Sequence, residues 1–211
     1  MKSILISIKP QWVEKILNGE KTIEIRKTMP RCELPCKVYI YCTKHNNYRN
    51  SLYLADDNKY DVDYYVPSDE SFILNGKVVA EFTLNEVKEY GYVYSPAMLM
   101  QGYYTKRGKE LNYSKTCLKL HEIEKYADDG HILPKPIYAW HIDNLKIYDK
   151  PKELSEFREP DFYRDCQKEC NDMERMRCST QDSHKVDIRC GWCRRKGKTL
   201  TRPPQSWCYV E

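Results

Sequence analysis

The sequence predicts an α+β fold in which short helices accompany several β-strands and a cysteine-rich segment lies near the C-terminus. Three observations support this class. Apolar residues recur at helical spacing over 10–18. Several other segments alternate between apolar and polar residues, as strands with one buried face do: 22–26, 37–43, 77–84 and 136–148. Cysteines are concentrated in 166–193, where few aliphatic residues occur.

Composition favours a globular chain of the cytoplasm. With 211 residues, 41% hydrophobic, the chain can bury one core, and its net charge of +4 permits nucleic-acid binding without requiring it. No run of 18 apolar residues occurs, so no membrane span is expected. The N-terminal apolar run is too short for a signal peptide, and Ile4, Ile6 and Ile8 alternate as in a strand. We therefore expect a cytoplasmic protein without a membrane partner.

Cysteine and tyrosine are unusually frequent. The ten cysteines would suggest disulfides in a secreted chain, but clustered cysteines in a reducing compartment more often bind metal. The 18 tyrosines can fill a core or stack on nucleic-acid bases. Composition therefore leaves both a metal site and a nucleic-acid ligand open.

The first expected helix covers 10–18. Pro10 suits a first helical turn, where its missing N–H is not needed. Gly19 stands where a left-handed residue ends a helix. The residues expected to face the core are Trp12, Val13, Ile16 and Leu17.

A strand over 22–26 follows directly. Its isoleucines would be buried on one face, while Thr22, Glu24 and Arg26 share the other face. Lys21 lies directly before the strand. Glu24 can pair with Lys21 or with Arg26. These charges form either an ordinary ion-pair ladder on the strand surface, which contributes little to stability, or one wall of a binding cleft.

Two further strands, 37–43 and 77–84, are expected in the first half of the chain. Glu81 in the second of them is either a pocket carboxylate or a solvent-facing charge. The acidic stretch 44–75 between them is poorly periodic, so we expect a long loop with one extra strand near Tyr60–Val66.

Cys32 and Cys36 precede the strand 37–43 and are separated by three residues. A zinc half-site can have this form, but no second pair follows nearby in the sequence. Plain thiols are the preferred interpretation of this pair.

The second half of the chain predicts one helix and one long strand. The helix lies within 95–131, with Ser114 as its cap. Residues 136–148 are expected to form a single strand. The buried face of the helix would carry Leu120, Ile123, Tyr126 and Ala127.

The octapeptide Gly19–Arg26 has the form G-x-K-x-x-E-x-R and resembles the signature of the ASCH (activating signal cointegrator homology) domain, of the PUA-like superfamily. All the fixed positions match, and later segments also look like the family: 37–43, 75–82, 138–157 and 202–210. The resemblance implies a PUA-like small β-barrel with flanking short helices. That domain would consist of 1–157 and 203–211, with 158–202 as a cysteine-rich insertion.

The resemblance also implies a cleft that takes RNA or a nucleoside. It places a helix with a terminal tyrosine near that cleft, so Tyr126 is a pocket candidate as well as a candidate core residue. A bound base needs stacking rings and polar groups for its Watson–Crick edge. Glu24 can accept from an exocyclic amine, and Arg26 or Lys21 can hold phosphate or carbonyl oxygens. The candidate ligand-binding residues are Trp12, Lys21, Thr22, Glu24, Arg26, Tyr41, Gln205, Ser206 and Trp207.

Catalysis is a second interpretation. Some small ASCH proteins are amidohydrolases acting on N4-acetylcytidine, and Glu24 stands where they have a proposed threonine nucleophile. Lys21 and Glu24, with Glu24 as general base on water, are the catalytic candidates. The covalent route is closed because Glu24 replaces the threonine, and Thr22, on the same face, lies about 7 Å away along the strand. Other members have been proposed as ribonucleases. Three functions stay open. The chain could bind RNA or a nucleoside without catalysis, hydrolyse a modified nucleoside or single-stranded RNA, or act as a protein-interaction module with a degenerate cleft.

The segment 158–202 has a candidate metal site of its own. Cys190 and Cys193 have the C-x2-C spacing of a zinc knuckle. A structural zinc would stabilise a segment that has almost no aliphatic core, whereas free or disulfide-bonded thiols are the alternative. The expected ligands are four of the five residues Cys166, Cys170, Cys178, Cys190 and Cys193. No organic cofactor is implied.

A basic run accompanies the knuckle, and no acidic residue occurs between 189 and 202. Such a run is either a contact surface for a nucleic-acid backbone or a solvated loop. Its members are Arg189, Arg194, Arg195, Lys196 and Lys198.

Overall fold

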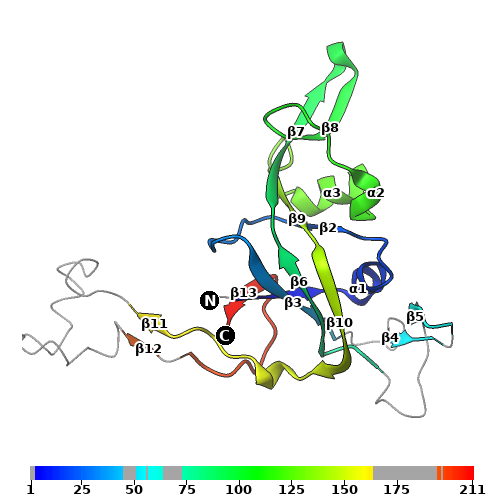
Figure 1. The fold of residues 1–211 in the computed structure, drawn as a ribbon. Helices are drawn as coiled ribbons and strands as arrows, with labels where there is room; N and C mark the ends of the chain where they lie inside the picture. The colour runs from blue at the N-terminus through cyan, green and yellow to red at the C-terminus, as the bar shows by residue number, and fades with distance from the viewer. Residues whose placement is uncertain (1–2, 45–50, 56, 64–72, 164–193, 196) are drawn as a thin grey trace, which may run out of the picture.

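The structure is a computed structural model that describes residues 3–44, 51–55, 57–63, 73–163, 194–195 and 197–211 (Figure 1). The backbone of Arg194 and Arg195 belongs to the described part, and Lys198 is exposed. The predicted zinc ligands and the rest of the basic run lie outside the described residues: Cys166, Cys170, Cys178, Cys190, Cys193, Arg189 and Lys196.

A five-stranded sheet forms the centre of the domain, with the order β10-β6-β3-β1-β13. Strand β1, next to the edge strand β13, pairs parallel with β3 and antiparallel with β13, so segments from both ends of the sequence meet there. The strands are β1 (Ser3–Ile8), β3 (Cys36–Cys42), β6 (Val78–Leu84), β10 (Asp143–Lys152) and β13 (Trp207–Val210).

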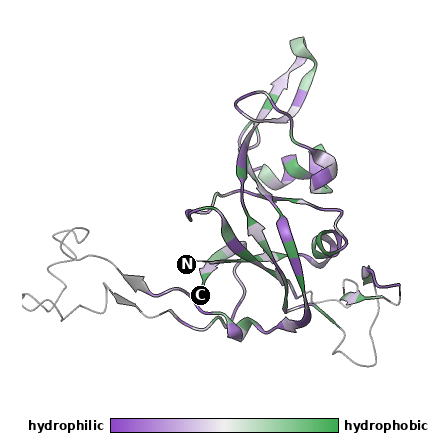
Figure 2. Cartoon of the chain, in the orientation of Figure 1, coloured by the Kyte–Doolittle hydropathy of each residue, from purple (hydrophilic) through white to green (hydrophobic). Residues whose placement is uncertain are grey.

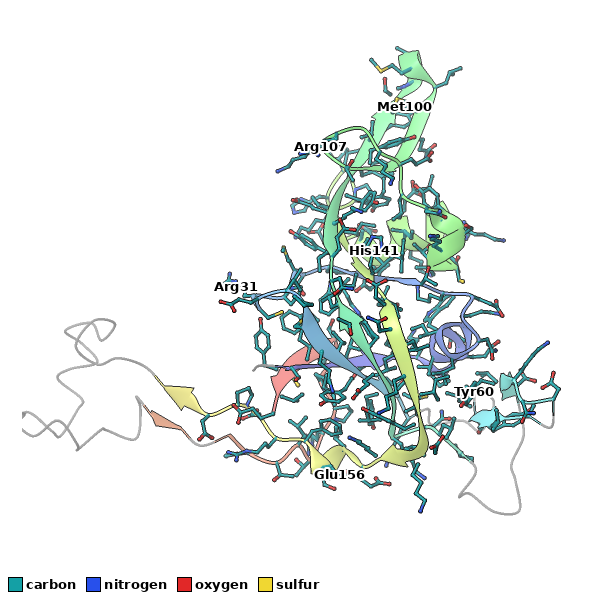
Figure 3. The ribbon with its side chains drawn as sticks, in the orientation of Figure 1. Arg31, Tyr60, Met100, Arg107, His141 and Glu156 are labelled. Carbon is teal, nitrogen blue, oxygen red and sulfur yellow. The ribbon has the colours of Figure 1, made fainter. Side chains whose placement is uncertain are left out.

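A second sheet of four strands has the order β2-β9-β7-β8. Its strands are β2 (Ile23–Arg26), β9 (Ile137–His141), β7 (Val87–Ser95) and β8 (Met100–Tyr104). The β7–β8 hairpin projects from the rest of the domain, with Met100 near its tip (Figure 3). Within the described residues these strands form separate open sheets, so the α+β class is confirmed, whereas hydrogen bonding does not close them into the small barrel that the resemblance implies.

The helices are short and lie beside the sheets. Among the described residues, no helix is long and apolar enough to cross a membrane. The helical segments are α1 (Pro10–Leu17), α2 (Tyr113–Thr116), α3 (Leu120–Ala127) and the 3-10 turns η3 (Pro96–Met98) and η4 (Leu154–Glu156). Two small two-stranded sheets complete the described elements: β4 (Ser51–Leu54) with β5 (Tyr60–Asp63), and β11 (Phe162–Tyr163) with β12 (Arg194–Arg195).

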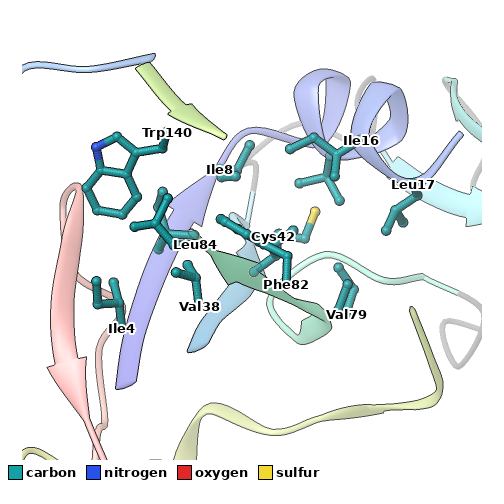
Figure 4. Close-up of a cluster of buried hydrophobic side chains, with 14 of the residues drawn as sticks. Ile4, Ile8, Ile16, Leu17, Val38, Cys42, Val79, Phe82, Leu84 and Trp140 are labelled. Atoms are coloured by element: carbon teal, nitrogen blue, oxygen red, sulfur yellow. The ribbon is translucent and has the colours of Figure 1, made fainter. Parts of the chain in front are cut away.

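The largest core cluster lies between α1 and one face of the five-stranded sheet. Ile16 and Leu17 of α1 face Cys42, Phe82 and Val79 in Figure 4, as the helical spacing predicts. Apolar and polar residues alternate along the strands (Figure 2), because successive side chains point to opposite faces. Burial of apolar side chains from both α1 and the sheet therefore holds this part of the domain together.

Two further clusters flank the first. Ile23 and Ile25 of β2 pack with Ile123 and Ala127 of α3 in the second cluster. The third cluster covers the opposite face of the five-stranded sheet: Leu5, Tyr41, Val78, Phe157, Leu200 and Val210. Leu200 joins this cluster although it lies inside the predicted insertion 158–202.

The two arms of that insertion run side by side. Glu159 N donates to Lys198 O over 2.8 Å, and Leu200 N donates to Phe157 O over 2.8 Å. Further out, β11 pairs antiparallel with β12. The chain therefore leaves and re-enters the domain at one place, next to the third cluster.

Several expected elements are confirmed, and two are wrong in part. The strands at β1, β2, β3 and β6 and the helix α1 lie where alternation and helical spacing place them. The helix expected within 95–131 is confirmed at α3, which buries Ile123 and Ala127 and ends before Asp128. Its start is wrong, because strand β8 and the short α2 come first, and Cys117, with a φ of 54°, ends α2. Asn112, not Ser114, caps α2, because its side chain accepts from Lys115 N.

The strand predicted over 136–148 is also wrong as a single element. It is divided into β9 and β10, which belong to different sheets. Asn144, just inside β10, has a φ of 50°, and the register of β10 against β6 shifts between Asp143 and Lys146. The alternating sequence pattern continues across this break, so periodicity could not reveal it.

Glu81 of β6 is fixed on the outer face of the five-stranded sheet. It accepts from Tyr148 Oη at 2.5 Å and pairs with Lys37 Nζ at 3.1 Å. Burial raises the pKa of Glu81, but these two donors outweigh it, so its net pKa lies below the usual value. Of the two sequence interpretations, the geometry corresponds to a surface charge with fixed partners.

We expect Tyr148→Phe to reduce the free energy of unfolding at pH 7 by about 1–3 kcal/mol, because Glu81 loses a charge-assisted hydrogen bond. Since the folded pKa of Glu81 is lowered, its contribution is present above about pH 4.5 and is lost as the pH falls through the folded value. Urea denaturation at pH 7 and pH 3 measures the difference. Tyr94→Phe, at an exposed position, is the matched control; an equal loss in both variants would contradict the prediction.

Candidate functional site

Lys21, Glu24 and Arg26 form a buried network of charges, which we call the charge triad. Lys21 Nζ lies 3.3 Å from Glu24 Oε2, and Arg26 Nη2 lies 3.1 Å from Glu24 Oε1. The three side chains are only 1%, 10% and 9% exposed, respectively. This burial excludes an ordinary solvated ladder on the strand surface, one of the two interpretations of the sequence.

The local sequence explains how β2 brings these side chains together. Gly19 ends α1 with a φ of 76°, and Lys21 N then donates to Lys15 O over 2.9 Å, which turns the chain into β2. In β2 the isoleucines enter the second core cluster. Alternation therefore directs Glu24 and Arg26 to the opposite face of the sheet, toward Lys21.

Segments far apart in the sequence supply the remaining partners of the two cations. Lys21 Nζ donates to the carbonyl oxygen of Thr116 over 2.6 Å. Arg26 Nη2 donates to Ser7 O over 2.8 Å, and Arg26 Nη1 donates to Ser206 Oγ over 3.3 Å. Removing charges from water is costly unless they are paired and hydrogen-bonded, and these contacts compensate much of that cost.

Aromatic rings enclose the charge triad. Trp12 lies under Lys21, with Nζ 5.6 Å from the ring centroid. Trp140 is directly opposite Glu24 in the β2–β9 pairing, and its ring centroid is 5.8 Å from that of Trp207. Trp12 and Trp207 are half-buried, whereas Trp140 is fully buried, so the first two are partly open to solvent.

Two buried donors in this group have no hydrogen-bond partner among the described residues. They are Arg26 Nε and Trp140 Nε1. Buried polar groups in folded proteins are nearly always hydrogen-bonded, to protein or to water. Both atoms belong to the face of β2 and β9 that carries the charge triad, so this face has donor capacity that the described chain does not use.

Tyr126 of α3 lies at the edge of the triad. Burial raises the pKa of the Tyr126 hydroxyl, the Glu24 carboxylate raises it further, and the Arg26 guanidinium lowers it. Lys27 Nζ lies 5.1 Å from the ring centroid. The ring is 38% exposed, so Tyr126 is a boundary between the charge triad and solvent rather than a core residue of α3.

The structure brings together some of the predicted site residues and not others. Trp12, Ser206 and Trp207 join the charge triad as described above. Thr22 is half-buried and contributes backbone hydrogen bonds to Lys115 and Ile142. Gln205 is exposed next to Ser206.

The prediction that Tyr41 belongs to the binding site is wrong. It is 2% exposed and packs in the third core cluster, on the opposite face of the five-stranded sheet from the cluster that contains Trp140. Alternation along β3 assigned Tyr41 to one of two faces, but the sequence could not say which face meets the triad.

Three residues of the site were missed in the sequence. Trp140 stands in an alternating strand, but only the pairing of β9 with β2 places it opposite Glu24. Ser7 and Thr116 act through backbone carbonyl oxygens, which every residue has, so no sequence signal identifies them. For Tyr126 the sequence left a core position and a pocket position open, and its exposure corresponds to the second.

A separate cavity of about 520 Å³ lies between the β7–β8 hairpin and α3. Its lining includes Tyr92, Tyr94, Glu124 and Ile132, and it contains none of the predicted site residues. The charge triad therefore does not share the cavity, and the two features are distinct.

No family model matches the chain, and no curated protein matches it. Among solved structures it is similar to the crystal structure of ASCH from Zymomonas mobilis, with 17% identity and a TM-score of 0.42 over 72% of this chain and 73% of that chain. A variant of that protein with tyrosine replaced by phenylalanine is similar at 16% identity and a TM-score of 0.42, over 73% and 77% of the two chains.

We expect Glu24→Gln to lower the free energy of unfolding by about 3–5 kcal/mol, because it leaves two buried cations without a counter-charge. Urea denaturation at pH 7 measures the loss. Glu20→Gln removes the exposed pair with Lys15 and should cost less than about 1 kcal/mol. Equal losses in the two variants would contradict the role assigned to burial of the triad.

Proposed function

We propose that this chain binds RNA or a modified nucleoside at the charge triad, using the tryptophans around it as stacking surfaces. The observation that carries the proposal is the pair of buried donors without partners, Arg26 Nε and Trp140 Nε1, beside buried cations. A ligand rich in hydrogen-bond acceptors would satisfy them. Phosphate oxygens and the carbonyl and ring-nitrogen acceptors of a nucleobase have this chemistry.

The aromatic neighbours support a planar ligand. Trp207 packs tilted against Trp140 and edge-on against Tyr209, with centroids 5.4 Å apart in the second pair. Trp207 Nε1 donates to Thr28 Oγ1 over 2.9 Å. Trp12 and Trp207 are half-buried, so part of each ring is open to a ligand. An unstacked base could stack on this open part, which favours single-stranded RNA or a free nucleoside over a duplex.

The state of Glu24 favours binding over hydrolysis. Each of its two carboxylate oxygens faces a cation, so the group is suited to accept hydrogen bonds and less available to take a proton from water. Lys21 Nζ contacts the Thr116 carbonyl oxygen as well as Glu24, so its donors are already engaged by the chain. A hydrolase mechanism would therefore have to break existing interactions of both catalytic candidates, Lys21 and Glu24.

The proposal is tested with Trp140→Phe, which keeps an aromatic ring and removes the Nε1 donor. Binding of fluorescently labelled single-stranded RNA and of free nucleosides, including N4-acetylcytidine, is measured by anisotropy and calorimetry. We expect the affinity of whichever ligand binds to fall about tenfold, the equivalent of one hydrogen bond. Phe82→Leu, in the same core cluster, is the matched control because it loosens packing without removing a donor.

Three results would contradict the proposal. The first is an absence of binding and of any change in melting temperature with every ligand, which would favour a protein-interaction module. The second is an equal loss of affinity in Trp140→Phe and Phe82→Leu. The third is release of acetate from N4-acetylcytidine, or cleavage of the RNA, that disappears in Lys21→Met; this outcome would favour the hydrolase interpretation.

For the cysteine-rich segment we keep structural zinc as a separate proposal, supported by the Cys190-Gly191-Trp192-Cys193 spacing. Protein purified without chelator should contain about one zinc per chain by elemental analysis. Cys190→Ser should remove the metal, whereas Cys117→Ser, in α2's C-terminal turn, should not. A zinc content far below one per chain in the unaltered protein would exclude this proposal.

A further inference from the structure

Cys32 and Cys36 form a chemically reactive pair that the proposed binding function does not use. Their Sγ atoms are 3.1 Å apart. Cys36 begins β3 and is buried, whereas Cys32 lies in the preceding loop 27–35 and is half-buried. The other described cysteines are Cys42, Cys117 and Cys208, and within the described residues the contact between two sulfur atoms is the one in this pair.

We propose that Cys32 and Cys36 are a site of reversible oxidation, at which a low-molecular-weight disulfide such as oxidised glutathione converts the two thiols into an intramolecular disulfide. Cys32 Sγ attacks one sulfur of the oxidant, forms a mixed disulfide and releases one thiol. Cys36 Sγ then attacks Cys32 Sγ, and the second thiol leaves with the proton from Cys36. One disulfide bond breaks in the oxidant and one forms in the protein, so two thiols are oxidised and two are produced.

The geometry is close to that of the product. A disulfide requires an S–S distance of about 2.05 Å, so the two sulfur atoms must approach by about 1 Å. Cys36 is fixed by the pairing of β3 with β6, where it lies opposite Leu84. Cys32 belongs to a loop, so the approach requires a small movement of loop 27–35 and leaves the sheet in place.

Exposure sets the order of the two steps. Cys32 is the sulfur that an oxidant in solution can reach. Burial raises the pKa of Cys36 to about 12, and the contact with Cys32 raises it in the same direction. Burial and the raised pKa therefore keep Cys36 from reacting first with an oxidant in solution. Cys36 attacks only in the second step, when its sulfur lies next to the mixed disulfide at Cys32 and its proton passes to the departing thiolate.

Metal binding is the competing role for two adjacent thiols. A tetrahedral zinc site needs four ligands, and no group of three or more histidine, cysteine, aspartate or glutamate residues suited to a metal exists within the described residues. The described surroundings of Cys32 and Cys36 thus supply the partners for a disulfide and not those for a metal site.

Oxidation would act on a loop that contacts the rim of the charge triad. Thr28 of loop 27–35 accepts from Trp207 Nε1 over 2.9 Å, and Arg31 N donates to Tyr209 Oη over 2.6 Å. Figure 3 labels Arg31 at the outer end of this loop. A disulfide between Cys32 and Cys36 would restrict the unfolded chain and fix the base of the loop.

The sequence provides a direct assay. Trypsin cleaves after Arg31 and after Lys37, so both cysteines fall in one peptide covering 32–37, while Cys117 falls in another covering 116–119. The full chain is equilibrated with reduced and oxidised glutathione, alkylated, digested and analysed by mass spectrometry. We expect the peptide 32–37 to lose both alkyl groups and two hydrogens as the buffer becomes more oxidising. The peptide 116–119 should keep its alkyl group.

Single variants separate the two roles. Cys36→Ser should accumulate a glutathione adduct at Cys32, whereas Cys32→Ser should leave Cys36 unmodified. The oxidised unaltered protein should melt a few degrees higher than its reduced form, and neither variant should show this shift. Retention of both alkyl groups at the most oxidising ratio, or equal adduct formation in the two variants, would overturn the proposal.

Discussion

The buried pairing of Glu24 with Lys21 and Arg26 is the constraint on which the rest of the site depends. Two cations and one carboxylate out of water are tolerated only when hydrogen bonds complete their coordination. Those bonds come from Thr116 after β8, from Ser7 in β1, and from Ser206 before β13. Elements from the beginning, middle and end of the domain must therefore be in place before the triad is stable.

Net positive charge inside the site has a consequence for what it can attract. The triad carries two cations for one anion, and its unused hydrogen-bonding groups are donors. In a region shielded from solvent such an excess acts over a longer distance and more strongly than the same charges on a surface. The chain as a whole is only mildly basic, at +4, so the local arrangement and not the overall charge would select an acceptor-rich ligand.

Alternation and helical spacing were sufficient to predict α1, β2 and the shared face of Glu24 and Arg26, because these features depend on neighbours in the sequence. The surroundings of the triad depend on pairing between distant strands. The β2–β9 register places Trp140 opposite Glu24. Tyr41 lies outside the site because it is on the face of β3 that packs in the third core cluster. The division of 136–148 between two sheets and the separation of α2 from α3 depend on left-handed residues, Asn144 and Cys117, that single-sequence patterns do not identify.

The position of β1 between β3 and β13 affects how the domain assembles. Ile6 is paired with Ile40 on one side and with Trp207 on the other, so its first partner is nearby in the sequence and its second is at the far end of the domain. Contacts over long separations form late because they close large loops. Ser206 and Trp207 reach their places only when β13 pairs with β1. Until then Arg26 lacks its hydrogen bond to Ser206. Folding errors in the cysteine-rich segment would consequently reach the charge triad through the strand β13 that follows this segment.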